Sequence, residues 1–181
     1  REALKANTTG GSNVGVGKRA LYTNTTGSNH TAVGLGALDA NTTSAANSAF
    51  GRDSLGANTT GDDNVALGYA ALFSNTTADN NTGVGYKALY LNTTGTQNTA
   101  VGAFALDAST TDNNNSGFGY KALSANTTGS SNTAVGSQAL ITATTATGNV
   151  GIGVNALLLA TTGSNNTAVG TTALDANTTG A

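Results

Sequence analysis

The sequence predicts an all-β protein, a parallel β-solenoid (β-roll) of about eleven 17-residue coils with two short strands per coil. Three observations lead to this fold. A 17-residue period runs through the chain without an insertion, each unit is rich in turn-forming residues, and the same positions in every unit are apolar. We expect residues 1–181 to form a single tandem-repeat solenoid, open at both ends, and to be a fragment of a longer fibre protein.

The period is clearest in a column of leucines, one in every unit. The same frame aligns pairs of threonines and a series of glycines from Gly17 to Gly170, and the unit reads approximately A-L-x-A-N-T-T-G-S-x-N-T-A-V-G-x-x. Equal unit lengths give every coil the same perimeter, as stacking of identical positions requires. The leucines are Leu4, Leu21, Leu38, Leu55, Leu72, Leu89, Leu106, Leu123, Leu140, Leu157 and Leu174.

The strands and turns follow from residue preferences within one unit. Helical repeats are the competing interpretation, but Asn, Thr-Thr and Gly recur too often to leave room for helices of about eight residues. The segment 132–136 (N-T-A-V-G) is typical of a strand, and a second short strand is expected around Ala122-Leu123-Ser124. The Asn-Thr-Thr-Gly and Gly-x-x positions are expected to form turns, because Gly and Asn tolerate positive φ.

Two neighbouring strand positions predict the inside and outside of the coil. The position of Val135 is always bulky and apolar, so we expect it to fill the interior together with the leucines. The preceding position is always Ala or Gly and points to the opposite face of the strand, which predicts close approach of another backbone, either a second chain or a tight corner of the same chain. The predicted inter-chain contacts are Ala32, Ala66, Ala100, Ala134 and Ala168.

Composition excludes several classes of partner. Charged residues make up only 9% of the chain and the net charge is −2, so no field is present to hold nucleic acid or an anionic membrane. No apolar run approaches the ~20 residues of a membrane span, which argues against membrane insertion, and the absence of Cys excludes disulfides and thiolate metal sites. Because one thin coil buries little apolar surface, we expect self-association, as an oligomer or an end-to-end polymer.

The segment 98–106 (N-T-A-V-G-A-F-A-L) resembles the head repeat of YadA-type trimeric autotransporter adhesins. With Asn-Thr-Thr-Gly included, the unit is similar to arrays in large bacterial and phage fibre proteins. The resemblance implies a trimeric β-roll in which the bulky column, such as Val101, faces the interior and the small column, such as Ala100, lies where chains approach. The 17-residue unit is longer than the spacing of the adhesin heads.

No catalytic, cofactor or metal site is predicted. The only histidine, His30, occupies a column that otherwise carries Asn, which indicates a structural substitution. Asp62, Asp63, Asp79 and Asp112 share one turn region, but they lack the spacing of calcium-binding rolls, so a solvated acidic turn is the preferred interpretation.

Asn-x-Thr/Ser sequons are frequent, and N-glycosylation is one interpretation of them. The other is structural, because the Asn13 column is nearly pure Asn outside the sequon pattern, which is typical of amide ladders. The candidate acceptors are Asn7, Asn24, Asn29, Asn41, Asn58, Asn75, Asn80, Asn92, Asn114, Asn126, Asn165 and Asn177.

These features predict a non-enzymatic structural repeat in the shaft or head of an extracellular fibre, or of a filament on a cell or virion surface. The alternative is an adhesin surface that binds a receptor or glycans through exposed tyrosines, namely Tyr22, Tyr69, Tyr86, Tyr90 and Tyr120. An ice-binding solenoid with stacked threonines is a third hypothesis, which a flat Thr-x-Thr face would favour.

Overall fold

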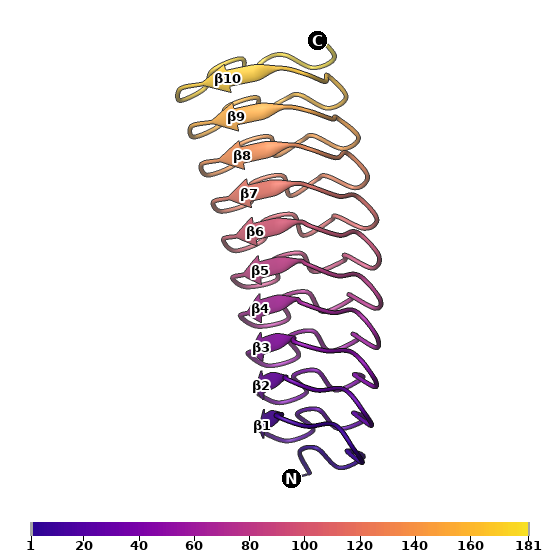
Figure 1. Cartoon of the computed structure of the whole chain (residues 1–181). Helices are drawn as coiled ribbons and strands as arrows, with labels where there is room; N and C mark the ends of the chain where they lie inside the picture. Colours follow the sequence, from indigo (N-terminus) through magenta and orange to yellow (C-terminus); the bar gives the residue numbers. More distant parts are fainter. Residues whose placement is uncertain (1, 181) are drawn as a thin grey trace.

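The computed structural model describes residues 2–180 as a parallel β-solenoid whose coils stack into a rod with the two ends of the chain at opposite ends (Figure 1). Ten strands of three residues form one parallel sheet in chain order. Pairing is in register at a distance of 17 residues, as in Ala100 beside Gly117. The strands are β1 (Val14–Val16), β2 (Thr31–Val33), β3 (Ser48–Phe50), β4 (Val65–Leu67), β5 (Thr82–Val84), β6 (Thr99–Val101), β7 (Ser116–Phe118), β8 (Thr133–Val135), β9 (Val150–Ile152) and β10 (Thr167–Val169).

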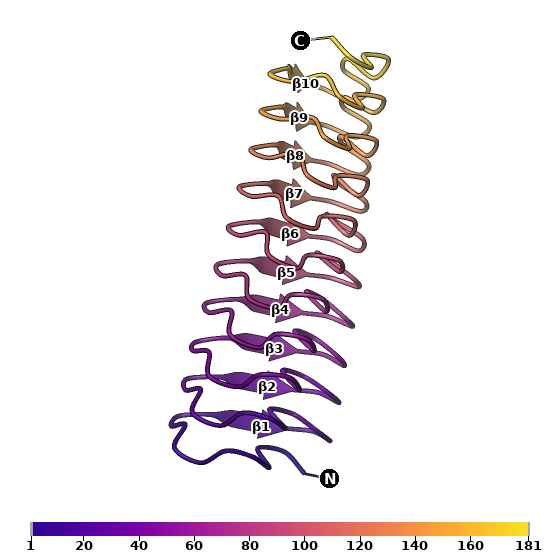
Figure 2. The same cartoon turned by 90° about the vertical axis from the view of Figure 1, so that its right-hand side faces the viewer.

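The predicted all-β parallel solenoid is confirmed, but the finer predictions need correction. Each coil has one strand instead of two, and the ten strands span about nine turns, slightly fewer than the eleven coils expected. The other side of each coil is a series of bends and turns, visible in Figure 2 as the irregular path that connects successive strands.

The segment expected to be a second strand is a turn because its leucine adopts a left-handed backbone. Leu123 has φ 55° and Lys121, two residues earlier, also has φ 55°. A left-handed non-glycine residue costs roughly 1–2 kcal/mol. Complete burial of the leucine side chain offsets this cost, since it contributes about 1.5–3 kcal/mol. The leucine column is therefore in the core as predicted, but on a turn.

Hydrogen bonds between coils continue outside the sheet. In the Thr-Thr segment the amide of Thr59 donates to the carbonyl of Thr76 at 2.8 Å, and in the leucine turn the amide of Leu106 donates to Ala122 at 3.0 Å. The backbone N–H and C=O groups of these turn residues thus form hydrogen bonds with the coil above or below. An inserted residue would break this pairing on both sides, which explains why the period tolerates none.

The glycine after each strand is required by the coil above it. Gly102 has φ 137°, and a Cβ atom there would lie 2.4 Å from the carbonyl oxygen of Gly119. Both the backbone angle and the close approach exclude other residues.

The side chains of each strand point in the opposite directions to those predicted. Ala32, Ala66, Ala100, Ala134 and Ala168 are buried within a single chain, so the prediction that these side chains form the inter-chain contact is wrong. The interior is narrow at this point: a Cβ atom on Gly83, in the same column, would lie 3.2 Å from Cγ of Leu72 and 3.3 Å from the carbonyl oxygen of Ala88. Only Ala or Gly fits there because the leucine of the same coil fills the space.

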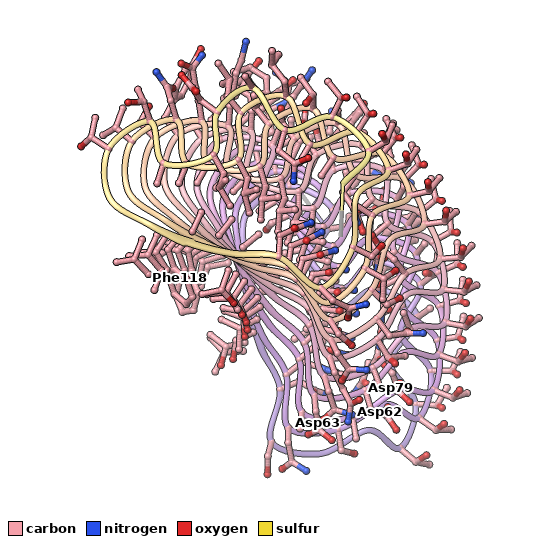
Figure 3. The ribbon with its side chains drawn as sticks, turned by 90° about the horizontal axis from the view of Figure 1, so that it is seen from above. Asp62, Asp63, Asp79 and Phe118 are labelled. Carbon is pink, nitrogen blue, oxygen red and sulfur yellow. The ribbon has the colours of Figure 1, made fainter. Side chains whose placement is uncertain are left out.

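The bulky column lies outside the coil. Val16, Leu67 and Phe118 are 55%, 49% and 40% exposed, so the prediction that this column fills the interior, Val101 included, is also wrong. In the view down the rod the ribbon traces a crescent, and Phe118 points away from the coil on its concave side (Figure 3).

This orientation predicts opposite responses to enlarging two adjacent residues. Ala100→Val should destabilise the protein by about 1–3 kcal/mol because the added methyl groups overpack the interior. Val101→Ile, the matched control, should change the free energy of unfolding by less than about 0.5 kcal/mol because its added methylene enters solvent. Urea unfolding at several protein concentrations measures both changes, and a larger effect at Val101 than at Ala100 would contradict the orientation.

Candidate functional site

The polar part of the coil interior consists mainly of two stacked columns of asparagine. In the first column, Nδ2 of Asn75 donates to Oδ1 of Asn58 in the coil below at 2.9 Å and to the carbonyl oxygen of Ala78 in its own coil at 3.0 Å. The bond to the coil below repeats at Asn24, Asn41, Asn58 and Asn92. These amides are fully buried, so each is held only by hydrogen bonds within the chain.

The second asparagine column lies beside the strand. Nδ2 of Asn64 donates to the carbonyl oxygen of Ala78 at 2.8 Å, and its Oδ1 accepts from the amide of Asn81 at 2.9 Å. One side chain thereby joins two coils. The predicted structural role of Asn in this column is confirmed by the burial and bonding of Asn47, Asn64, Asn81, Asn98, Asn115, Asn132 and Asn149.

His30 replaces one of these asparagines and reproduces both of its bonds. Its Nε2 lies 2.8 Å from the carbonyl oxygen of Ser44, and its Nδ1 accepts from the amide of Asn47 at 3.2 Å. This network assigns the neutral ring with the proton on Nε2. Burial lowers the pKa of His30 because it penalises the charged form.

The first asparagine column is interrupted at Ser109, where an aspartate fills the gap. Ser109 donates to Oδ1 of Asp112, and Nδ2 of Asn126 donates to Oδ2 of the same carboxyl group. The side chain of Asp112 therefore supplies the acceptor that an asparagine at position 109 would have provided. Burial raises the pKa of Asp112 to about 6, against the opposing effect of the Ser109 hydrogen bond.

The same ladder explains two buried amide oxygens that lack a partner. Oδ1 of Asn92 and Oδ1 of Asn126 have no hydrogen-bond donor among the described residues. The next coils carry Ser109 and Ala143 where an asparagine would donate. Both orphaned atoms therefore mark interruptions of the ladder and need no ligand to explain them.

The sequons divide into two groups. Asn24, Asn41, Asn58, Asn75, Asn92 and Asn126 are buried in the first ladder, so the folded coil cannot carry a glycan on them. Asn7 and Asn177 belong to the same column in the end coils and are partly exposed. Asn29, Asn80, Asn114 and Asn165 are exposed at a turn where each has a left-handed backbone. N-glycosylation stays a prediction, and this last group is the accessible one.

The acidic turn is bonded within the chain. Oδ1 of Asp62 accepts from the amide of Ala45 at 2.7 Å, and Oδ1 of Asp79 accepts from the amide of Asp62 at 2.7 Å. Asp62, Asp63 and Asp79 lie at the turn that precedes the sheet (Figure 3). Within residues 2–180, no group of three or more His, Cys, Asp or Glu side chains is placed to hold a metal ion.

The lysines, arginines and most aromatic residues gather on the opposite edge of the coil. We call this surface the aromatic edge; it consists of the columns of Tyr69, Ala70 and Phe73. It carries all five tyrosines and every lysine and arginine of residues 2–180.

The aromatic edge contains a hollow of about 130 Å³ beside Ala70. Its lining residues are Asp53, Tyr69, Ala70, Phe73, Lys87 and Tyr90. Sequence reasoning named only the two tyrosines. The 17-residue frame also aligns Asp53, Ala70 and Lys87. This alignment is the sequence signal that could have placed the two charged residues beside the tyrosines.

The chain matches no family model, no curated protein and no solved structure. The resemblance to adhesin heads and fibre arrays therefore rests on the repeat motif alone. Among residues 2–180 there is also no helix with the length and hydrophobicity needed to span a membrane.

The threonine pairs do not form a flat hydroxyl face. The first threonine of each pair donates its hydroxyl to the next coil, as Thr59 does to the carbonyl oxygen of Thr76 at 3.0 Å. Outside the end coils, only the second threonine of each pair, such as Thr60, is exposed. One column of free hydroxyls beside a turn gives the ice-binding hypothesis little support.

The Ser109 and Asp112 pair predicts a pH-dependent stability that a double substitution removes. The native pKa of Asp112 lies above its ordinary value, so the folded protein binds the proton more tightly and loses stability as pH rises from about 4 through about 6. Ser109→Asn/Asp112→Gly restores the repeat and should raise the melting temperature at pH 7 by a few degrees. The gain over the unmodified protein should shrink toward pH 4, as measured by thermal unfolding.

The unmodified protein is the matched reference, because His30 is present in both chains and its opposite pH dependence cancels in the difference. An equal gain at pH 4 and pH 7 would contradict the role assigned to the Asp112 carboxyl group.

Proposed function

We propose that the chain is a non-enzymatic structural repeat that forms the shaft or head of an extracellular fibre, and that copies of it associate along the outer face of the sheet. The observation that carries the proposal is the continuous apolar ladder on that face. Association through it replaces the role first assigned to the buried alanine column.

The apolar ladder contains one bulky side chain in each of the ten strands. Its members are Val16, Val33, Phe50, Leu67, Val84, Val101, Phe118, Val135, Ile152 and Val169. Seven of these ten are at least 38% exposed. The flanking outward column, from Val14 to Thr167, holds only Val, Thr and Ser, so the face is free of charge along its whole length. A contiguous apolar surface of this kind is typical of an interface.

A second copy of the chain is the partner that best fits this ladder. Side chains in the ladder recur at the spacing of adjacent strands, ~4.8 Å. Another solenoid of the same coil height can match this spacing over all ten rows, whereas a globular partner would meet only a few of them. A homotrimer is the assembly that the repeat motif implies, and end-to-end polymerisation is the other expectation.

A non-enzymatic role is favoured by what the polar groups do. His30 and Asp112, whose pKa values are shifted, both occupy positions in the asparagine ladders and bond to neighbouring coils. Perturbed titratable groups are candidates for catalysis when they converge in a cleft. These two lie in the interior and complete the stacking of coils.

Replacing exposed ladder residues should reduce self-association. We expect Leu67→Ser/Phe118→Ser to lower the association constant at least tenfold, because each change removes apolar area from the interface. Leu91→Ser/Leu159→Ser is the matched control, since both leucines are 44% exposed but lie off the sheet. Sedimentation equilibrium measures the association constant, and circular dichroism verifies that every variant is folded.

Two results would overturn the proposed association. One is a protein that stays monomeric at high micromolar concentration. The other is equal weakening by the ladder variant and by the control, which would show that the sheet face is not the interface.

A further inference from the structure

The hollow on the aromatic edge is created by a small residue between two charged ones. Asp53, Ala70 and Lys87 stand in one column on three successive coils. Larger side chains occupy this column elsewhere, such as Phe104 and Gln138. Ala70 leaves a space with a carboxylate on one side and an ammonium group on the other.

Aromatic rings form the two walls of the hollow. Tyr69 stacks on Tyr86 with ring centroids 5.3 Å apart and an angle of 11° between the planes. Phe73 stacks on Tyr90 at 5.6 Å and 15°. Stacking along the coil axis fixes the ring orientations, so both aromatic walls are formed without a ligand.

The two charged groups differ in whether they already form an ion pair. Asp53 pairs with Arg52, with Oδ2 at 3.0 Å from Nε. Nζ of Lys87 lies 4.7 Å from the ring centroid of Tyr90 and 5.7 Å from that of Tyr86, and it has no carboxylate within 4.0 Å among the described residues. Its donors can therefore bind a ligand without breaking an ion pair.

We propose that this hollow binds one sugar ring of a glycan. A pyranose ring presents C–H groups on its faces, which suit the aromatic walls, and hydroxyl groups around its rim. Asp53 accepts hydrogen bonds from hydroxyls and Lys87 donates to them, so opposite sides of the rim are recognised. The site goes beyond a purely mechanical role and assigns a ligand class to the edge opposite the acidic turn.

The size and charge of the hollow favour this ligand class over others. At about 130 Å³ it is smaller than the ~300 Å³ of the smallest ordinary small-molecule pockets, which favours a single ring over a larger molecule. A nucleic-acid strand would place phosphates beside Asp53, which repels them. The site also lies on a different edge from the apolar ladder, so binding is compatible with assembly.

A variant that fills the hollow tests the proposal without removing a contact. Ala70 has φ 52°, and Phe104 occupies the same column with φ 57°, so the backbone accepts Ala70→Phe. Tyr90→Ala removes a wall. Gln138→Phe is the matched control, since it adds the same ring in the same column, at φ 58°, away from the hollow.

Saturation-transfer NMR with methyl glycosides of glucose, galactose, mannose and N-acetylglucosamine identifies the ligand, and titration gives its affinity. We expect at least one glycoside to bind, with affinity at least tenfold weaker in Ala70→Phe and in Tyr90→Ala and unchanged in Gln138→Phe. Absence of binding to all four, or equal binding by Ala70→Phe, would overturn the site. Sedimentation of the same variants reports on assembly separately, so failure of one proposal leaves the other standing.

Discussion

Hydrogen bonding between residues 17 positions apart is the interaction on which the rest of the structure depends. It pairs strands with strands and turns with turns, so every coil must have the same length and path. This constraint permits backbone angles that are unfavourable alone, such as the left-handed leucines, because the pairing and the burial of each leucine recover their cost. It also places equivalent side chains in straight columns, which turns any repeated residue into a ladder.

The ladders give this thin rod an interior in which asparagine amides lie beside the leucines and alanines. Each buried asparagine joins its own coil to a neighbour, so a substitution is accepted where it reproduces those bonds, as His30 does. Ser109 and Asp112 show that compensation can come from a different column at the cost of a buried carboxyl group. Side chains on the outside of the coil do not have to form these hydrogen bonds. The surface is divided into an apolar sheet face, an acidic turn and an aromatic edge.

The sequence alone predicted the fold class, the leucine core, the position of the strand and the structural asparagines, because period and residue preference report directly on stacking. It failed on the second strand, since leucine has no preference for the left-handed backbone of Leu123. It also reversed the strand faces. Alternation shows that Ala100 and Val101 point in opposite directions, but which of them points inward depends on how much space Leu89 leaves, and that is a property of the closed coil. The hollow could not be predicted because its residues come from three coils.

The proposed fibre interface is formed by the exposed bulky column, while the small column next to it is buried inside the coil, and cysteine cross-linking tests both assignments at once. The chain has no native cysteine, so single variants are clean probes. On oxidation, Val101→Cys should form disulfide-linked pairs of chains across the sheet face, while Ala100→Cys should stay unlinked inside the coil. Cross-linking of Ala100→Cys instead, or of neither variant, would contradict the account.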